Sequence, residues 1–260
     1  ISLALGIGAN TAIFTLINAV MVRSLPVERP EQLVLLGDGS TRGIVTGLSG
    51  RWNIFPYPLY EHLRGHGRSF EGLCAFRTVL DRLGVRPEGA EGREMHLARG
   101  RLVSGNYFSV LGVNAMLGRT LTPEDDRSAA APAAVISYRY WERQLHLDSS
   151  IVGRTVTVNG IPFTVVGVTP PEFFGESLEN TLADFWLPMT LQPRVMQRES
   201  FLEDSVINWI NVIGRLKPGI SSEQAQADIN VMFHQFLTEH AGPHPSAAEE
   251  RNNQKSYICL

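Results

Sequence analysis

The sequence predicts an α+β fold that follows an N-terminal membrane helix. Short strand and helix patterns are mixed along the chain, without the regular long β-α-β spacing that a doubly wound parallel sheet needs. The first residues, from Ile1 to Val22, contain no Asp, Glu, Lys or Arg. The chain has 260 residues, 43% of them hydrophobic, which is enough for one large domain or two small ones around a core.

The uncharged N-terminal run is interpreted as a transmembrane helix. At about 1.5 Å per residue, a helix of this length crosses a hydrocarbon core about 30 Å thick. Arg23, Pro26 and Pro30 end the run and mark the exit from the membrane. A secretory signal would show a basic start and a small-residue cleavage site, and neither is visible. A single Arg23 does not set the orientation, because the positive-inside rule needs both flanks.

The rest of the chain is predicted to form short strands and helices. Strands are expected at residues 32–36, 73–76, 80–85, 95–103, 133–137, 185–189 and, with alternating burial, 209–216. Helices are expected at residues 57–64, 104–112 and 138–145, and from Ser221 or Ser222 to about residue 240. Ser104 is expected to be an N-cap and Gly112 a C-terminal stop. Residues 37–50 and the segment from His244 are expected to be loops, and residues 255–260 the start of a strand.

The strongest local signal is a β-hairpin centred on Asn159-Gly160. Two runs of β-branched residues flank this dipeptide, which accepts positive φ at both turn positions. The helix after Ser221 is also well marked, because one of its faces is apolar. That face comprises Ala225, Ile229, Met232, Phe233 and Phe236.

We find no motif for catalysis or for a cofactor. The sequence lacks a G-x-x-x-x-G-K-[ST] phosphate loop and a G-x-S-x-G elbow, and Gly6-Ile-Gly8 lacks the strand and third glycine of a dinucleotide fingerprint. The formal net charge of −3 gives no reason to expect a nucleic-acid partner. Any ATP is therefore expected to be hydrolysed elsewhere.

The histidines and acidic residues do not predict a metal site. His62 and His66 are spaced i, i+4, but Gly65 and Gly67 are expected to end that helix, and no H-E-x-x-H motif surrounds the pair. Surface histidines are the preferred interpretation. The acidic run 124–126 could hold a cation, but a helix N-terminus is expected instead.

Cysteine and tryptophan positions indicate structural roles. Cys74 and Cys259 lie far apart and match no metal or redox spacing, so two separate thiols are preferred over a disulfide. Trp141, Trp186 and Trp209 stand among apolar residues and are expected in the core.

Phe173 and Phe174 form an aromatic pair on a loop bounded by Pro171 and Gly175. Two adjacent aromatic side chains on such a loop cannot easily both point inward. They either contact a neighbouring subunit or cover the core, and the sequence leaves both possibilities open.

The motifs, taken in order, resemble the MacB/FtsX-like ABC transporter permeases, and more specifically the large duplicated permeases common in acidobacteria. Each motif alone is weak, but the ordered set covers nearly the whole chain. The motifs are the apolar start 6–14 with the exit 22–26, followed by residues 57–60, 103–113, 118–120, 136–141, 152–154, 159–160, 166–168, 171–175 and 214–219.

The resemblance implies a permease in the bacterial inner membrane with a large extracytoplasmic domain. Residues 1–25 would be its first transmembrane helix, truncated, and residues 26–260 a MacB-like periplasmic core domain, truncated at its C-terminus. That domain would combine a porter-like α+β lobe with a second, β-rich lobe. The implied partners are a cytoplasmic ABC ATPase subunit, a second permease copy (as a dimer or an internal duplication) and membrane lipid. No catalytic residue, metal or cofactor is implied.

The function expected is coupling of cytoplasmic ATP hydrolysis to export or mechanical transmission. Arg23, Pro26 and Pro30 form the expected coupling segment between the helix and the domain, because prolines keep such a connection stiff. The alternative is a membrane-anchored binding or adaptor domain without a transport role. A secreted enzyme is a third class, but it would need a polar pocket that the sequence does not predict.

Overall fold

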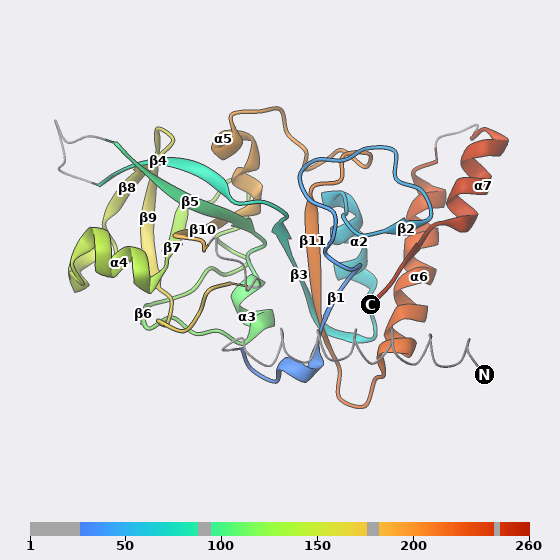
Figure 1. Cartoon of the computed structure of the whole chain (residues 1–260), viewed down its shortest axis with the longest axis horizontal. Helices are drawn as coiled ribbons and strands as arrows, with labels where there is room; N and C mark the ends of the chain where they lie inside the picture. Colours follow the sequence, from blue (N-terminus) through green and yellow to red (C-terminus); the bar gives the residue numbers. More distant parts are fainter. Residues whose placement is uncertain (1–26, 88–94, 176–181, 242–244) are drawn as a thin grey trace, which may run out of the picture.

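The computed structural model describes residues 27–87, 95–175, 182–241 and 245–260, which form two lobes side by side (Figure 1). The predicted transmembrane helix, with Arg23 and Pro26, lies outside the described residues. Within the described ranges, none of the helices combines the length and apolar character that a bilayer crossing requires.

The elements follow the predicted mixture of short strands and helices. The helices are η1 (Pro30–Gln32), α2 (Tyr57–His66), α3 (Tyr107–Leu111), α4 (Tyr138–Leu145), η2 (Ser149–Ile151), η3 (Met189–Leu191), α5 (Gln192–Met196), α6 (Ser222–Glu239) and α7 (Ala247–Lys255). The strands are β1 (Leu33–Leu35), β2 (Arg51–Trp52), β3 (Phe70–Arg77), β4 (Asp81–Pro87), β5 (His96–Val103), β6 (Leu117–Gly118), β7 (Ala133–Ile136), β8 (Thr155–Val158), β9 (Ile161–Val168), β10 (Phe185–Pro188), β11 (Ile210–Leu216) and β12 (Tyr257–Ile258). The class is therefore α+β, as predicted.

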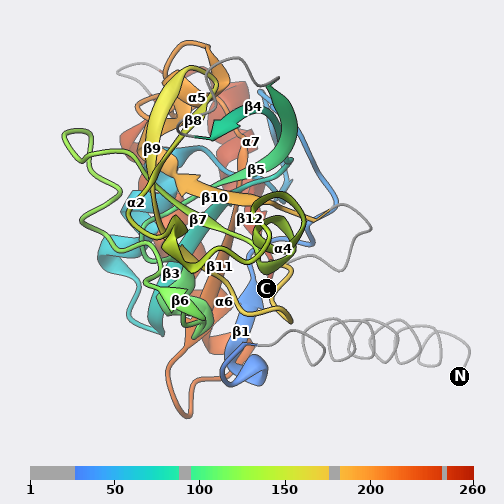
Figure 2. The same cartoon turned by 90° about the vertical axis from the view of Figure 1, so that its left-hand side faces the viewer.

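One lobe is a small closed β-barrel, which faces the viewer in Figure 2. Its strands pair in the order β5-β10-β7-β9-β8-β4, and β4 pairs back with β5. Closure leaves these strands without a free edge. Val156 and Val158 of β8 are buried, whereas Thr155 and Thr157 between them are half-exposed, which is the alternation expected of a barrel strand. We call these six strands, together with β6, α4, η2, η3 and α5, the barrel lobe, of which α3 is not a part.

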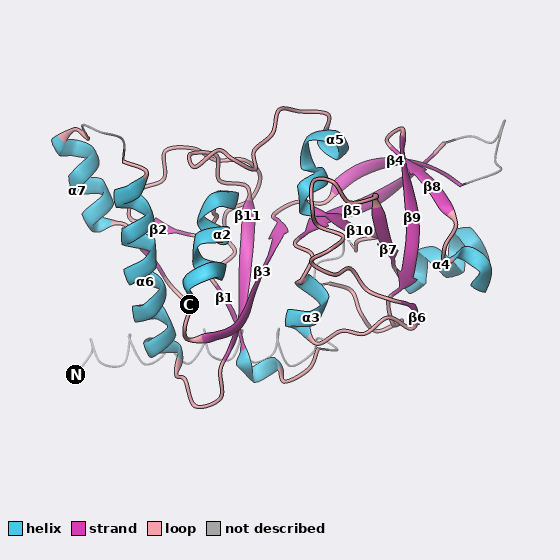
Figure 3. Ribbon diagram, turned by 180° about the vertical axis from the view of Figure 1, so that it is seen from behind, coloured by secondary structure: helices cyan, strands magenta, loops and turns pink. Residues whose placement is uncertain are grey.

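The other lobe consists of two β-α-β segments between which the barrel is inserted. The first is β1-α2-β3 and the second is β11-α6-β12, with β11 antiparallel to both β1 and β3. Helices α2 and α6 lie together on one face of these strands, and α3 covers the other (Figure 3). We call this part the helical lobe.

Strand β11 departs from its predicted alternation. All seven of its residues are buried, because helices cover both faces of the strand. Strand β3 connects β11 to the barrel lobe. It pairs with β5 at Phe76 and Val103, and the chain then continues directly into β4.

The predicted hairpin is confirmed. Strands β8 and β9 pair around Asn159 (φ 47°) and Gly160 (φ 82°). The Asn159 side chain does more than permit the turn: its Oδ1 accepts from the Gly84 amide at 2.8 Å, and its Nδ2 donates to the Val195 carbonyl at 2.9 Å. The turn therefore also connects β4 and α5.

The predicted helix after Ser221 is confirmed together with its buried face. Ser221 and Gln224 form a reciprocal capping box. Ala225, Ile229 and Phe233 are fully buried, and the Phe233 ring packs on Trp52 at 5.0 Å. The three tryptophans expected in the core, Trp141, Trp186 and Trp209, are also buried.

The prediction of a loop from His244 was wrong, because α7 occupies Ala247–Lys255. This helix has no buried residue, so no hydrophobic periodicity could reveal it. Its signal is the capping box of Ser246 and Glu249. The predicted strand at 255–260 is correspondingly shorter, since Lys255 ends the helix and only β12 is extended.

Two helix boundaries also differ from the prediction. Asn106, not Ser104, is the N-cap of α3, because the Ser104 hydroxyl binds the Ala75 amide instead. Helix α2 continues through Gly65 to His66 and ends at Gly67, whose amide bonds the Leu63 carbonyl. Gly112, in contrast, ends α3 as predicted, with φ 71°.

Candidate functional site

The first described residues dock where α3 meets the sheet of the helical lobe. The Glu28 amide donates to the Leu111 carbonyl, at the C-terminal end of α3, at 3.1 Å. Arg29 has φ 45°, and Pro30 then starts η1, which leads into β1. Pro30, of the predicted coupling segment, therefore fixes the direction in which the chain enters the domain.

Arg215 holds residues 27–32, which we call the entry segment, in place. The residue lies on β11 and is only 4% exposed. Its Nε donates to the Val110 carbonyl at 2.8 Å, and its Nη1 donates to the Arg29 carbonyl at 3.0 Å. Burial and the neighbouring Arg29 lower the pKa of the Arg215 guanidinium, although it stays charged at any ordinary pH. One side chain thus joins β11, α3 and the entry segment.

Gly112 allows the entry segment to come this close. A Cβ at this position would collide with Glu28, so only glycine permits the contact. Its positive φ also ends α3, leaving the Leu111 carbonyl available to Glu28. The same glycine therefore ends a helix and forms a docking point.

The other end of α3 is joined to β3 and α2 by a polar network. The Ser104 hydroxyl accepts from the Ala75 amide at 2.9 Å and donates to Asn106 Oδ1 at 2.8 Å. Asn106 Nδ2 donates to the Leu73 carbonyl at 2.8 Å, and the Tyr60 hydroxyl donates to Asn106 Oδ1 at 3.1 Å. Since Tyr60 and Ser104 are both fully buried, this network fixes α3 against the helical lobe.

Gly105, which lies between Ser104 and Asn106 in the chain, connects α3 to the barrel lobe. Its amide donates to Asp126 Oδ2 at 2.9 Å, and Asp126 Oδ1 accepts from the Thr190 amide at 2.8 Å. Burial raises the pKa of Asp126, while these two amide bonds oppose the rise. The carboxylate thus bridges the start of α3 and η3, which follows β10.

The acidic run 124–126 is therefore not a helix N-terminus, as was predicted, but part of a turn. Asp125 accepts from the Thr122 amide at 2.8 Å and forms a two-point ion pair with Arg119 at 2.6 and 2.8 Å. These local bonds satisfy the carboxylate without a helix.

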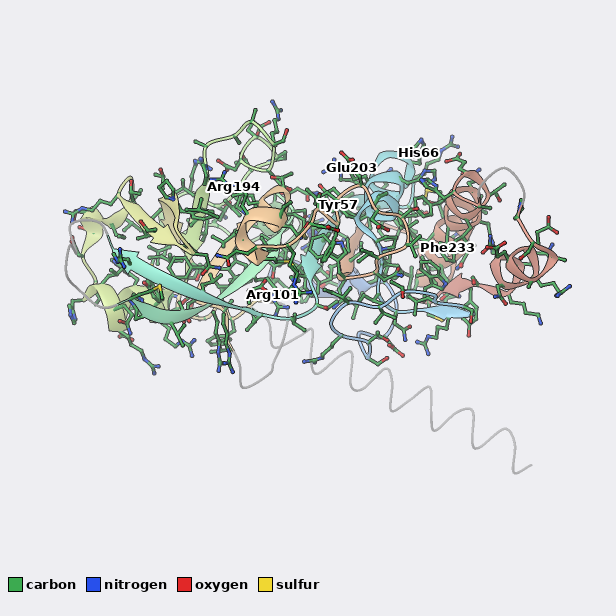
Figure 4. All side chains as sticks on the ribbon, turned by 90° about the horizontal axis from the view of Figure 1, so that it is seen from above. Tyr57, His66, Arg101, Arg194, Glu203 and Phe233 are labelled. Atoms are coloured by element: carbon green, nitrogen blue, oxygen red, sulfur yellow. The ribbon has the colours of Figure 1, made fainter. Side chains whose placement is uncertain are left out.

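A second charged cluster lies where β3 passes into β4. Arg77 forms an ion pair with Asp81, and Arg101 donates to the Arg77 carbonyl at 2.7 Å. Burial raises the pKa of Asp81, and the two arginines oppose the rise. Arg101 lies between the two lobes in the view from above (Figure 4), with its guanidinium 5.5 Å from the Phe76 ring centre. Removing one member of such a cluster would strand a buried charge, so it stiffens the connection.

The aromatic pair is divided between core and surface. Phe173 is 2% exposed and packs on Phe108 and Trp186, so it covers the core. Phe174 is 43% exposed. It borders a cavity of only about 30 Å³, beside Arg139. Contact with a neighbouring subunit stays a prediction for Phe174, whereas Phe173 is not accessible to one.

His62 and His66 do share a helix face, with ring centres 4.8 Å apart. His62 Nδ1 lies 3.9 Å from Glu239 Oε2, and His240 stacks on Phe236 nearby. Among the described residues, no three His, Cys, Asp or Glu side chains are arranged to hold a metal ion. Cys74 and Cys259 are not joined by a disulfide.

We expect the domain to lose stability in mild acid because of His62. Burial and then His66 lower its pKa below the ordinary value of 6.5, with His240 also lowering it and Glu239 opposing. Below about pH 6.5 the unfolded chain therefore binds more protons than the folded one at this residue. The free energy of unfolding should fall there by at most about 1.4 kcal/mol per pH unit, until the pH passes the folded-state pKa.

Urea titrations at several values between pH 7.5 and 5 would measure this loss, using about half-unit steps. His62→Gln should make the profile less steep over this range, but not flat, because burial also lowers the pKa of His96. The matched control His146→Gln, at the exposed end of α4, should leave the profile unchanged. Parallel profiles for His62→Gln and the unmodified chain would contradict the assignment.

Arg215 is the residue of this site that sequence reasoning missed. It lies within the 214–219 motif, but its partners Val110 and Arg29 are distant in the sequence, so no local pattern pointed to it. The described residues of the site join the entry segment, α3 and both lobes.

Comparisons with known proteins agree with this architecture. Residues 1–231 match the family model described as the MacB-like periplasmic core domain. A search of curated proteins finds no match.

Three solved structures are similar in fold. The periplasmic region of MacB from Actinobacillus actinomycetemcomitans has a TM-score of 0.58 at 14% identity, covering 83% of this chain and 86% of its own. The extracellular domain of the ABC-type transporter YknZ from Gram-positive bacteria has a TM-score of 0.52 at 15% identity, covering 80% and 95%. A domain of a putative permease protein from Porphyromonas gingivalis has a TM-score of 0.54 at 13% identity, covering 88% and 99%. At these identities the likeness is one of fold.

Proposed function

Since the chain belongs to the MacB-like periplasmic core domain family, we propose that it is the extracytoplasmic part of an ABC transporter permease and transmits motion from the membrane. In this proposal, residues 1–25 are the first transmembrane helix in the bacterial inner membrane, and residues 26–260 lie on the periplasmic side. The permease works with a cytoplasmic ATPase subunit and with a second permease copy. The domain itself carries out no catalysis.

The observation that carries the proposal is the attachment of the entry segment by Glu28 and Arg215. A displacement of the chain at residue 27 is passed to α3 through the Glu28–Leu111 bond, and to β11 through Arg215. Helix α3 is in turn fixed to α2 through Tyr60 and to the barrel lobe through Asp126. A rigid connection of this kind can move both lobes together, which a flexible tether to a binding domain would not require.

The test separates ATP hydrolysis from movement of the domain. A six-residue Gly-Ser insert between residues 26 and 27 should leave ATP hydrolysis by the complex intact and abolish the nucleotide-dependent movement, because such a linker behaves as a random coil. The same insert after Gly47 is the control, since the open space around this glycine should tolerate it.

Movement can be followed without knowing the cargo. Gln235→Cys, on the exposed face of α6, in a Cys259→Ser background, allows a fluorophore to be placed on each permease copy. Energy transfer between the copies should change with ATP in the unmodified protein and in the Gly47 control. An unchanged response in the chain with the insert at residue 26 would refute the coupling role.

The partner assignment has its own test. Purification of the full-length protein from gently solubilised membranes should recover an ATPase subunit in stoichiometric amount. Its clear absence would favour a membrane-anchored binding or adaptor domain.

We include Phe174 in the proposed contact surface for a neighbouring subunit, because it is exposed on a loop that Phe173 anchors in the core.

A further inference from the structure

The outer face of the β4–β5 hairpin carries an unusual set of side chains. The strand register places Arg82 opposite Arg99 and Gly84 opposite Leu97. Two residues further along each strand, Arg86 and Met95 also lie on this outer face, towards the tip of the hairpin. We call these six positions the arginine face.

Nothing in the described part of the chain neutralises or covers this face. Leu97 is 73% exposed and Met95 is 59% exposed. Arg82, Arg86 and Arg99 are exposed, and none of them forms an ion pair with another described residue. Like charges directly opposite on paired strands are destabilising, so the Arg82–Arg99 pair costs stability in the isolated domain.

Recognition at this face must use side chains. Residues 81–85 and 96–100 pair with each other, so this outer face is the surface of paired strands and presents side chains to a partner. Guanidinium groups bind carboxylates or phosphates at two points, and the exposed Leu97 between them suits an apolar contact. The Met95 side chain lies over Gly84, where it adds to the apolar surface beside Leu97.

We infer that the arginine face binds an acidic, extended segment of a partner protein. Residues four apart along a strand are about 13 Å apart. An extended segment with carboxylates at positions i and i+4 would therefore meet the Arg82–Arg99 pair at one end and Arg86 at the other. An apolar side chain at i+2 would then lie on Leu97.

The position of the face favours a protein over a lipid surface. The β4–β5 hairpin lies at the upper side of the molecule, and η1, where the chain enters the domain, lies at the lower side, in both side views (Figures 1 and 2). This step rests on the proposed function, in which the entry segment faces the membrane. Phosphate groups of that membrane would then be on the wrong side of the domain.

A defined peptide tests the inference. The probe has nine residues with Glu at positions 3 and 7, Leu at position 5, uncharged polar residues elsewhere and capped ends. It is titrated by fluorescence anisotropy against the full chain in phosphatidylcholine nanodiscs. Saturable binding is expected, weakening as salt is raised, because screening acts on exposed charges.

Variants locate the binding. The double variant Arg82→Glu with Arg99→Glu should weaken the peptide affinity at least tenfold. The double variant Arg82→Gln with Arg99→Gln should also weaken it at least tenfold, because each substitution removes about one charge pair without reversing the charge. Leu97→Ser should weaken it about threefold at every salt concentration, since this contact is apolar. Arg143→Glu with Arg198→Glu, exposed elsewhere, is the matched control and should have little effect.

Three results would overturn the inference. One is that the Arg82/Arg99 variants bind the peptide with the same affinity as the unmodified chain. Another is that the unmodified chain shows no saturable binding up to about 1 mM peptide. The third is arginine-dependent binding to phosphatidylglycerol vesicles that the peptide does not displace, which would assign the face to lipid. None of these measurements needs the ATPase or the energy-transfer response, so failure here is separable from failure of the proposed coupling role.

Discussion

Arg215→Met should lower the free energy of unfolding by about 2–4 kcal/mol. Methionine keeps most of the aliphatic volume of the side chain but removes the donors to the Val110 and Arg29 carbonyls. A buried polar group left without a partner costs about 1–3 kcal/mol. The Arg29 carbonyl still accepts from the Gln32 amide at 3.0 Å when the Arg215 donors are removed, so we expect less than the full sum for two carbonyls. Urea denaturation followed by tryptophan fluorescence would measure the change.

The matched control is Arg143→Met, at an exposed position of α4. It should change the stability by no more than about 0.5 kcal/mol, as is usual for surface positions. Arg215→Lys is informative as well, because lysine keeps the charge but has one nitrogen in place of the Nε and Nη1 that reach the Val110 and Arg29 carbonyls. If Arg215→Met were no more destabilising than Arg143→Met, the stabilising role assigned to the buried Arg215 side chain would be wrong.

The same substitution should also uncouple movement from hydrolysis under the proposed function. Without Arg215, the polar contacts between the entry segment and the rest of the described domain are the Glu28–Leu111 bond to α3 and the surface ion pair of Arg29 with Glu71 on β3. Exposed ion pairs of this kind contribute little. The energy-transfer response should therefore shrink in Arg215→Met while ATP hydrolysis continues.

Local signals in the sequence were sufficient where one short segment determines its own structure. Asn159-Gly160 predicted its hairpin because the turn needs two residues with positive φ. Either Ser221 or Ser222 was predicted to start α6, and the structure shows that Ser221 is the cap. The apolar spacing that follows predicted the buried face. Helix α7 was missed for the complementary reason: without a buried face, only its capping box remained as a signal.

Features created by long-range packing could not be read in this way. Barrel closure depends on the pairing of β4 with β8, two segments about 70 residues apart in the chain. The resemblance suggested a second, β-rich lobe, but no residue pattern indicated that it closes. Likewise, the seven residues of β11 are buried on both faces only because α3 and the pair α2 and α6 meet there.

The candidate site shows the same division. Gly112 was predicted as a helix stop, but its second role, admitting Glu28, depends on a contact with the entry segment. Ser104 was recognised as a side chain that binds a backbone amide, yet the amide belongs to Ala75 on β3 and not to α3. In both cases the residue type indicated the kind of role from the sequence, but the sequence did not identify the partner.

Gly105→Ala should destabilise the domain by about 2–4 kcal/mol. A Cβ at this position would lie 2.5 Å from the Thr122 carbonyl oxygen and 2.8 Å from Pro123 Cα. Both are backbone atoms, so no side-chain rotation can relieve the overlap. Overpacking of this kind usually costs about 1–3 kcal/mol. Any shift would also weaken the bond from the Gly105 amide to the buried Asp126, which adds to the loss.

Gly65→Ala provides a control of opposite sign. Gly65 lies inside α2 with nothing within 4 Å of an added Cβ, so alanine there should stabilise the domain by about 0.5–1 kcal/mol through helix propensity. Both free energies come from the same urea titration. Because Gly105 connects α3 to the barrel lobe, its alanine variant should also weaken protection of the Thr190 amide against hydrogen exchange. A stable variant with unchanged protection at Thr190 would mean that the two lobes are held together elsewhere, with the Arg77–Asp81–Arg101 cluster as the next place to look.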